Sequence, residues 1–311
     1  MVLSDHLQSE TYQQIPRDSD SNVIIKLNDL VKKYNKRFTE KEIDFLTNFE
    51  WKSSEFYVLP KTHKCPSIMN AVRKSTERYI HIPSPIDLKA RPIVAGPIAP
   101  THRLSNFIDI LLKPFVTMQP SYIKDNWHFI RELPEQIDFE CTLFSCDIVN
   151  LYTTITHELG LEAINYWLNK YPEMLPERFS KEFVLKSILF ILTNNNFIFD
   201  NVMYTQLIGT AIGTKFAPPY ACLTIGYLEL TKLFPRLSSI CSKINSERIY
   251  KYFKRYMDDG FTPLPLEIDQ DKFLELLNSM HPNIKYTMEA AKVYSDKQLM
   301  NFLDITVILK K

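Results

Sequence analysis

The sequence predicts an α+β fold in which amphipathic helices are interspersed with short, mostly antiparallel strands. Apolar residues recur at helical spacing in several segments, and two-residue turn signals join short apolar runs elsewhere. The chain has 311 residues, of which 45% are hydrophobic, enough to bury one large core or two modest ones. Helices mixed with antiparallel hairpins are typical of the α+β class.

Residues 21–48 carry apolar side chains at helical spacing and predict two helices separated near residues 37–39. Thr39 and Glu42 have the spacing of a capping box, which predicts where the second helix begins. Further helices are predicted by the same spacing, or by prolines suited to a first helical turn. These segments are residues 101–118, 159–168, 183–192 and 218–233.

The predicted strands are short. Seven prolines between Phe56 and Pro100 restrict that region to strands and loops. Apolar residues in Cys141–Asp147 predict a buried strand that ends in an aspartate. Asp200-Asn201 and Asp258-Asp259-Gly260 each predict a tight hairpin turn.

Charge and cysteine usage narrow the class of protein. The net charge is only +1, but residues 52–113 hold ten Lys and Arg against four Asp and Glu. This excess fits either a solvated face or a surface that binds phosphates.

The five cysteines form no C-x-x-C pair, so we expect reduced core thiols. No leader or membrane-length apolar run occurs, which predicts a soluble intracellular protein; a nuclear location is compatible with the sequence but not determined by it.

Two strands that each deliver acids to one point would form a site for divalent cations. Asp258 and Asp259 lie between apolar strands, and Asp147 ends another. Crowded, partly buried carboxylates are costly unless a cation neutralises them. Mg²⁺ prefers hard oxygen ligands, and two such ions suit phosphoryl transfer.

These segments resemble the palm motifs of reverse transcriptases. Leu143–Tyr152 (LFSCDIVNLY) is similar to the first palm motif, and Tyr256–Asp259 (YMDD) is similar to the Y-x-D-D motif. Gln206–Pro218 (QLIGTAIGTKFAP) resembles the glycine-containing motif that precedes the palm helix, although Ile212 replaces a methionine found in many relatives.

Three further segments resemble the Penelope-like element reverse transcriptases, which are relatives of telomerase. Leu59–Lys64 (LPKTHK) and Arg91–Pro97 (RPIVAGP) resemble their fingers motifs, and Asn301–Ile305 (NFLDI) resembles the strand after the palm. The resemblance implies a right-hand polymerase fold with an antiparallel palm sheet and packed helices. It divides the chain into an N-terminal helical extension (1–50), fingers (51–140) and palm (141–311) with a helical insertion near 156–196. Because the chain ends at Lys311, we expect neither a thumb nor a GIY-YIG nuclease domain.

The resemblance also implies the roles of the palm residues. Asp147 and Asp258 would be catalytic and bind two Mg²⁺ ions, for which Mn²⁺ could substitute, with help from the backbone carbonyl of Ile148. Asp259 would complete the carboxylate cluster. Tyr152 would be a steric gate against the ribose 2′-hydroxyl, although a core tyrosine is the alternative.

Fingers residues would bind nucleotide and template. Arg91 would contact the incoming triphosphate, and Lys61 and Lys64 would contact phosphate or template. Gly213 would let the backbone approach the nucleotide, whereas Gln206 would either bond a base or sugar or end its strand. A lysine that protonates pyrophosphate is expected after the hairpin, and the candidates are Lys285 and Lys292.

The expected function is therefore RNA-directed DNA polymerisation, with an RNA or DNA template, a primer and deoxynucleoside triphosphates as partners. An RNA-directed RNA polymerase would share the acids, but Tyr152 favours DNA synthesis. A catalytically idle nucleic-acid-binding fragment, or a structural chain whose acids occupy a turn, would be alternatives from other classes.

Overall fold

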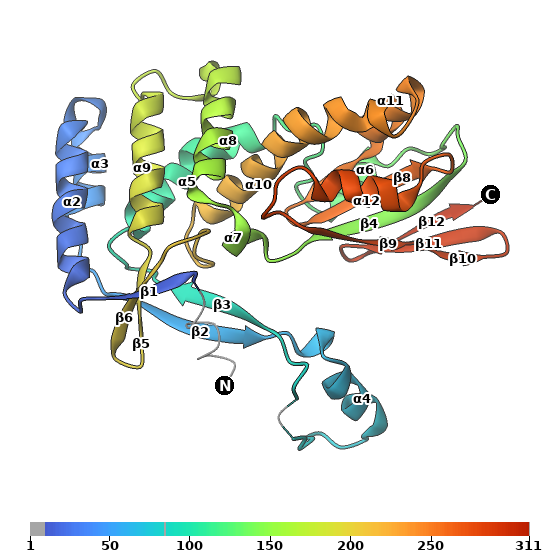
Figure 1. Ribbon diagram of the computed structural model, residues 1–311. Coiled ribbons are helices and arrows are strands. Elements are labelled where there is room, and N and C mark those ends of the chain that lie inside the picture. The colour runs from blue at the N-terminus through green and yellow to red at the C-terminus, as the bar shows by residue number, and fades with distance from the viewer. Residues whose placement is uncertain (1–9, 84, 311) are drawn as a thin grey trace. The chain divides into compact units, whose positions relative to one another are not determined.

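The computed structural model describes residues 10–83 and 85–310, which form two compact units (Figure 1). The first unit comprises the chain up to Asn106 together with Phe190–Lys215. The second comprises Phe107–Leu189 and the chain from Phe216 onward. The chain returns to the first unit because the hairpin of β5 and β6 pairs with strands there. This division differs from the predicted fingers and palm ranges, since residues 107–140 lie in the second unit and 190–215 in the first.

A five-stranded sheet forms the centre of the first unit, with strand order β1-β6-β5-β2-β3. β2 and β5 run parallel, and the other neighbours are antiparallel. Aromatic residues pack on it, and Phe56 stacks on Phe197 with ring centroids 5.1 Å apart. The strands are β1 (Tyr12–Ile15), β2 (Ser54–Pro60), β3 (Ala90–Ala95), β5 (Asn196–Phe199) and β6 (Val202–Gln206).

The predicted helices of the first unit are confirmed. Residues 19–47 form α2 (Ser19–Lys33) and α3 (Glu40–Thr47), and the capping box forms as predicted, with the Thr39 amide donating to Glu42 over 2.8 Å. The prediction that residues 56–100 hold only strands and loops is wrong at α4 (Pro66–Lys74), because the proline there occupies the first turn of a helix, where its missing N–H is not needed. The Asp200-Asn201 hairpin is also confirmed, because both residues have positive φ and Phe199 pairs with Val202.

The second unit contains two antiparallel sheets. One has the strand order β7-β8-β4-β9 and the other β10-β11-β12. The first sheet comprises β4 (Cys141–Ile148), β7 (Lys254–Tyr256), β8 (Asp259–Pro265) and β9 (Tyr286–Ala290). The second comprises β10 (Lys292–Tyr294), β11 (Lys297–Phe302) and β12 (Ile305–Lys310).

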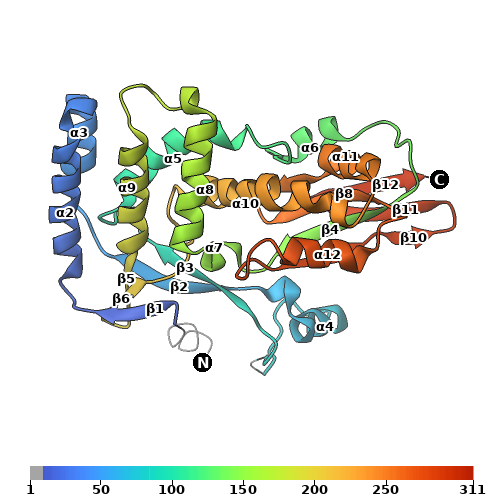
Figure 2. The ribbon, with the colours of Figure 1, turned by 45° about the horizontal axis from the view of Figure 1, so that its top comes forward.

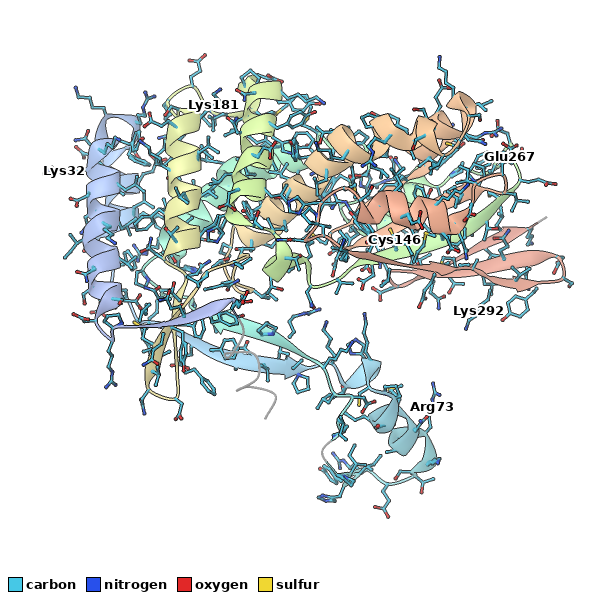
Figure 3. The ribbon with its side chains drawn as sticks, viewed as in Figure 1. Lys32, Arg73, Cys146, Lys181, Glu267 and Lys292 are labelled. Atoms are coloured by element: carbon cyan, nitrogen blue, oxygen red, sulfur yellow. The ribbon has the colours of Figure 1, made fainter. Side chains whose placement is uncertain are left out.

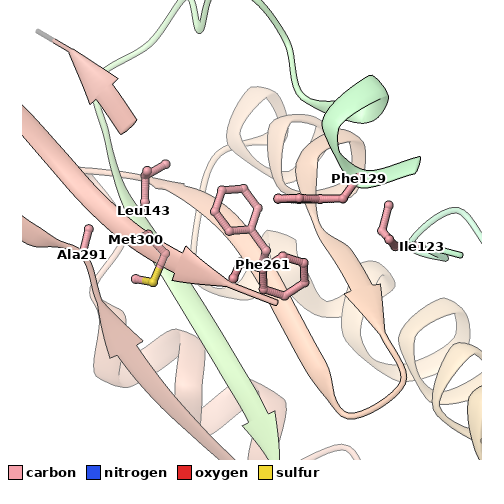
Figure 4. Close-up of a cluster of buried hydrophobic side chains, with 7 residues drawn as sticks. Ile123, Phe129, Leu143, Phe261, Ala291 and Met300 are labelled. Atoms are coloured by element: carbon pink, nitrogen blue, oxygen red, sulfur yellow. The ribbon is translucent and has the colours of Figure 1, made fainter. Parts of the chain in front are cut away.

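A buried apolar cluster joins these two sheets (Figure 4). Leu143 of β4 and Phe261 of β8 pack with Met300 and Phe302 of β11 and with Phe129. The side chain of Gln298 adds polar links, since its oxygen accepts from the Leu143 amide and its nitrogen donates to the Cys141 carbonyl. β4 is therefore paired within its own sheet and also packed against β11 of the other sheet.

Helices of the second unit pack around α10, which is buried along almost its whole length (Figure 2). Trp167 of α8 donates to the Leu223 carbonyl over 2.8 Å. α10 continues to Leu233 as a π-helical segment, so the helix predicted at 218–233 is confirmed. The helices and helical turns of the second unit include α6 (Asn126–Glu132), α7 (Leu151–Thr154), α8 (His157–Lys170), α10 (Ala217–Leu228), η4 (Glu229–Leu233), η5 (Phe234–Ser239), α11 (Lys243–Tyr252) and α12 (Gln270–Asn278).

Two helices cross the division between the units in the sequence: α5 (His102–Val116) and α9 (Lys181–Thr193). Both agree with predicted helical segments. No helix within residues 10–83 and 85–310 is long and apolar enough to span a membrane.

Two predicted elements differ in the structure. The hairpin expected at Asp258-Asp259-Gly260 turns at Met257 and Asp258, because Tyr256 pairs with Asp259 and Gly260 lies inside β8. The strand expected at Asn301–Ile305 is a hairpin in which Leu303 adopts φ 53° between β11 and β12.

Gly260 is needed for close strand packing, since a Cβ atom there would lie less than 3.0 Å from Cys146 Sγ. We expect Gly260→Ala to lower the free energy of unfolding by about 1–3 kcal/mol through overpacking. Cys146→Ala combined with Gly260→Ala should recover most of that loss, because Cβ then replaces the sulfur. Urea unfolding of the two single variants and the double variant measures this. A double variant as unstable as Gly260→Ala would contradict it.

Candidate active site

The register of three strands places polar residues in one row across the second unit's four-stranded sheet. Asp147 of β4 lies directly opposite Asp259 of β8 on one side and Thr287 of β9 on the other. Directly opposed residues in antiparallel strands project to the same face, with Cβ atoms about 4.5–5.5 Å apart. The predicted acids from distant sequence segments, Asp147 and Asp259, are therefore neighbours.

Asp258 occupies the turn of the β7-β8 hairpin. Its carbonyl accepts a hydrogen bond from the Ile148 amide over 3.1 Å, which ties the turn to the end of β4. The preceding Met257 has φ 55°, a left-handed conformation that residues with side chains seldom adopt. A strained backbone conformation of this kind persists only where surrounding contacts stabilise it, and such conformations are frequent at functional sites.

The electrostatics of this row suit a cation. Asp147, Asp258 and Asp259 are all half-buried, and like charges directly opposed across a ladder are destabilising. Within the described ranges, no group of three or more His, Cys, Asp and Glu side chains is arranged to hold a metal ion. The structure thus gathers an opposed carboxylate pair, and the three-acid metal site stays a prediction. One or two carboxylates with substrate phosphates are the ligand set that Mg²⁺ usually has in proteins, so the donors fit.

Cys146 is a buried residue of β4 beside the predicted acids (Figure 3). It precedes Asp147, faces the opposite side of β4 and is buried. Burial raises the pKa of its thiol to about 12. A neutral thiol therefore lies behind the acids and adds no charge at neutral pH.

Tyr152 follows the acid strand after a sharp change of chain direction. Asn150 has φ 53°, and the single-turn helix α7 begins at Leu151. Tyr152 lies on that turn, half-buried, in the same unit as the acids. Its assignment as a sugar gate stays a prediction.

The two candidate lysines differ in position. The Lys285 carbonyl accepts from the Val149 amide over 2.8 Å, so the Lys285 backbone adjoins the end of β4. Its exposed Nζ donates to the Asn278 carbonyl over 3.3 Å. Lys292 lies on the exposed edge strand β10 (Figure 3). Proximity to β4 favours Lys285 over Lys292.

In the first unit, the predicted basic residues lie along one ladder and its end. Exposed Arg91 of β3 is opposite Leu59 of β2. The Lys61 amide extends the ladder by donating to the Lys89 carbonyl over 2.8 Å. Lys64 is exposed on the adjoining short helix η2 (Thr62–Lys64). Leu59 and Arg91, which are directly opposed, project to one face of the sheet, and Lys61 and Lys89 follow at the end of the same ladder.

Gly213 and Gln206 have structural partners in the first unit. Gly213 has φ +132°, and a Cβ atom would lie under 3.0 Å from the Val94 carbonyl oxygen, so glycine permits close packing on β3. The Gln206 side chain is 2% exposed and donates to the Ile208 carbonyl over 2.8 Å. This burial supports the strand-ending alternative for Gln206 over a bond to a base or sugar.

Sequence reasoning missed Thr287. Its hydroxyl lies 3.5 Å from the Asp147 carbonyl oxygen, and only the pairing of β4 with β9 reveals that it belongs to the row of acids. No local sequence signal distinguishes it from any exposed threonine of a strand.

Comparison with known proteins shows the fold. No protein-family model matches the chain, and no curated protein matches it in sequence. Among solved structures, telomerase from Candida albicans in complex with a TWJ fragment of telomeric RNA has a TM-score of 0.54 and 9% identity, covering 91% of this chain and 50% of that one.

Two other similar structures have lower TM-scores. Apo telomerase from Candida tropicalis, truncated from its C-terminal domain, has a TM-score of 0.46 and 10% identity over 67% of this chain and 45% of that one. The RNA-dependent RNA polymerase of bacteriophage phi12 has a TM-score of 0.47 and 13% identity, covering 91% of this chain and 47% of that one. The chain spans about half the length of these proteins. The predicted α+β, right-hand polymerase fold is confirmed by the Candida albicans structure.

Proposed function

We propose that the chain is an RNA-directed DNA polymerase of the Penelope-like kind, a nucleotidyltransferase that adds deoxynucleotides to a primer 3′-hydroxyl. The observation that carries the proposal is the opposed pair Asp147 and Asp259 at the hairpin that also holds Asp258. The fold shared with a telomerase supports it. The motif resemblance supplies the finer family and substrate assignment.

Two Mg²⁺ ions, when bound, would activate the primer hydroxyl and stabilise the charge on the leaving pyrophosphate. Asp147 and Asp258 would hold them, with the Ile148 carbonyl as a neutral ligand and Asp259 supplying further negative charge. The strand ladder fixes these donors before substrate arrives. Phosphoryl transfer depends mainly on positioning and charge, so rigid strands suit it.

Other residues would select and hold the nucleotide. Tyr152 would exclude the ribose 2′-hydroxyl by its bulk. Arg91 has a planar donor fork that suits a triphosphate, and half-buried Lys61 and exposed Lys64 would contact phosphate or template. Lys285 would donate a proton to pyrophosphate. The partners would be an RNA or DNA template, a primer and deoxynucleoside triphosphates.

Primer extension on an RNA template tests the function directly. We expect wild type to extend the primer only with Mg²⁺ or Mn²⁺, and Asp258→Ala to lower the rate at least about 1,000-fold, because a metal ligand is lost. Asp296→Ala, a change to an exposed acid in the β10-β11 turn, is the matched control. Template binding without extension by wild type would instead indicate an idle binding fragment. Extension with ribonucleotides alone would indicate an RNA polymerase.

The gate is tested by the sugar that is incorporated. We expect Tyr152→Ala to raise ribonucleotide incorporation relative to deoxynucleotide by about 10- to 100-fold, since space opens beside the 2′-carbon. Tyr152→Phe keeps the ring and should retain wild-type selectivity. Competition between labelled nucleotides measures the ratio of kcat/KM. An alanine variant with unchanged selectivity would assign Tyr152 to the core.

Metal binding is tested without turnover. In metal-free buffer, Asp147→Asn should unfold at a temperature equal to or higher than that of wild type, because it removes a like-charge pair worth a few tenths of a kcal/mol. Added Mn²⁺ should raise the Tm of wild type through binding to the folded state, and raise that of Asp147→Asn much less. Asp296→Asn is the matched control. Equal Mn²⁺ shifts in all three proteins would argue against the site.

A further inference from the structure

Arg255 of β7 is a fully buried cation, and the proposed chemistry assigns it no role. Its side chain is 0% exposed, and its Nε lies 2.5 Å from Oε1 of Glu229, which is 1% exposed. Burial by itself would lower the pKa of Arg255, but the Glu229 carboxylate raises it above its ordinary value. The two residues form a charged pair in the interior of the second unit.

The rest of the guanidinium is also bonded. Nη1 donates to the Met257 carbonyl over 2.9 Å. Nη2 donates to Gln119 Oε1 over 2.8 Å and to the Cys222 carbonyl over 3.2 Å. Only the planar, five-donor fork of arginine can reach this many acceptors at once.

Glu229 is itself held from two directions. It is the first residue of the π-helical segment η4, where the regular α-helix α10 ends. π-helical turns inside helices are rare and are frequent at functional sites. Its second oxygen accepts from Ser121 Oγ over 2.5 Å. The Ser121 carbonyl in turn accepts from the Arg255 amide over 2.6 Å, which closes a ring of contacts around the pair.

A glycine makes room for this network. A Cβ atom on Gly226 of α10 would lie less than 3.0 Å from the Gln119 side chain. Gly226 therefore lets Gln119 lie against α10 and accept from Arg255. Three separate segments, residues 119–123, α10 with η4, and β7, meet at one guanidinium.

The bond to Met257 reaches the proposed catalytic turn. The Met257 carbonyl belongs to the peptide group that precedes Asp258, and Met257 is the residue with the left-handed φ. The Ile148 amide holds the peptide group that follows Asp258. Asp258 is thus fixed through both of its flanking peptide groups, one by Arg255 and one by β4.

Stability alone does not explain such a pair. Apolar residues of similar volume often replace a buried ion pair with no loss of stability, whereas removal of one partner is strongly destabilising. The hydrogen bond from Arg255 to the Met257 carbonyl fixes the orientation of that peptide group. An apolar side chain could not do this.

We infer that Arg255 and Glu229 are positioning residues that hold the Met257-Asp258 turn in the geometry needed for catalysis. The inference rests on the proposed function, because it assigns a role to the turn that carries Asp258. Neither residue would touch the substrate.

The test separates positioning from stability with three variants. Arg255→Lys keeps a charge beside Glu229 but cannot form the fork. Arg255→Met combined with Glu229→Leu replaces the whole pair by apolar side chains. Arg248→Lys is the matched control, since Arg248 is half-buried in the same unit and bonds Asn245. Each protein is measured for Tm, for steady-state primer extension, and for amide hydrogen exchange of residues 256–262 in metal-free buffer, with residues 141–148 as the internal reference.

We expect Arg255→Lys to lower kcat by roughly 10- to 100-fold, because small displacements of a catalytic group are costly. The KM for the nucleotide should change by less than about threefold, as fits the loss of an interaction made mainly in the transition state. The double variant should recover a Tm near that of wild type while kcat stays low, and residues 256–262 should exchange faster relative to 141–148. Arg248→Lys should match wild type in all three measurements.

A double variant that recovers kcat together with Tm would overturn the inference and leave only a structural role for the pair. Unchanged exchange at residues 256–262 in both variants would overturn it too. If wild type shows no extension, the proposed function fails, and exchange alone decides whether the pair holds the turn. If Arg255→Lys does not fold, the double variant carries the same comparison.

Discussion

The antiparallel register of β4 and β8 is the constraint on which the rest of the candidate site depends. A slip of one residue would send every side chain of β8 to the opposite face and separate Asp259 from Asp147. Gly260 opposite Cys146 favours the observed register, because only a residue without a side chain fits against that sulfur. Phe261 and Met300 pack with Leu143, and strand alternation puts Leu143 and Phe261 on the same face as Asp147 and Asp259, farther along the ladder. Glycine packing on one face and the apolar cluster on the other together fix a register that opposes two carboxylates, an unfavourable arrangement that a bound cation would relieve.

The turn follows from that register. Once Asp259 is paired with both Asp147 and Tyr256, only Met257 and Asp258 remain to reverse the chain. One of the two must adopt an unusual backbone conformation, and Met257 does so without being glycine. Two hydrogen bonds compensate for this strain: Arg255 donates to the Met257 carbonyl, and the Ile148 amide donates to the Asp258 carbonyl. A strained turn beside opposed acids is thus a consequence of strand pairing combined with a buried cation.

Local signals in the sequence were sufficient for much of this fold. The capping box at Thr39 and the hairpin at Asp200-Asn201 depend on residues close in sequence, and both formed as predicted. Pairing between distant segments was not predictable in the same way: β1 joins β6, and Thr287 joins the row of acids only through β9. The Asp-Gly pair at 259–260 favoured a turn there, but the register with β4 overrode that local preference. Arg255 looks like an ordinary strand cation in sequence, since Glu229 lies 26 positions away.

Sugar choice and phosphoryl transfer would reside in different local structures. The acids depend on the ladder between β4 and β8, whereas Tyr152 depends on the left-handed residue Asn150 and the single turn of α7. A fold can host many chemistries, so the shared polymerase fold does not itself fix the sugar of the product. A carboxylate row would handle the triphosphates of either sugar alike, since the reacting phosphates are the same. Under the proposed function, selectivity would come from side-chain bulk near the ribose, and a change in α7 would alter it while leaving the strand register intact.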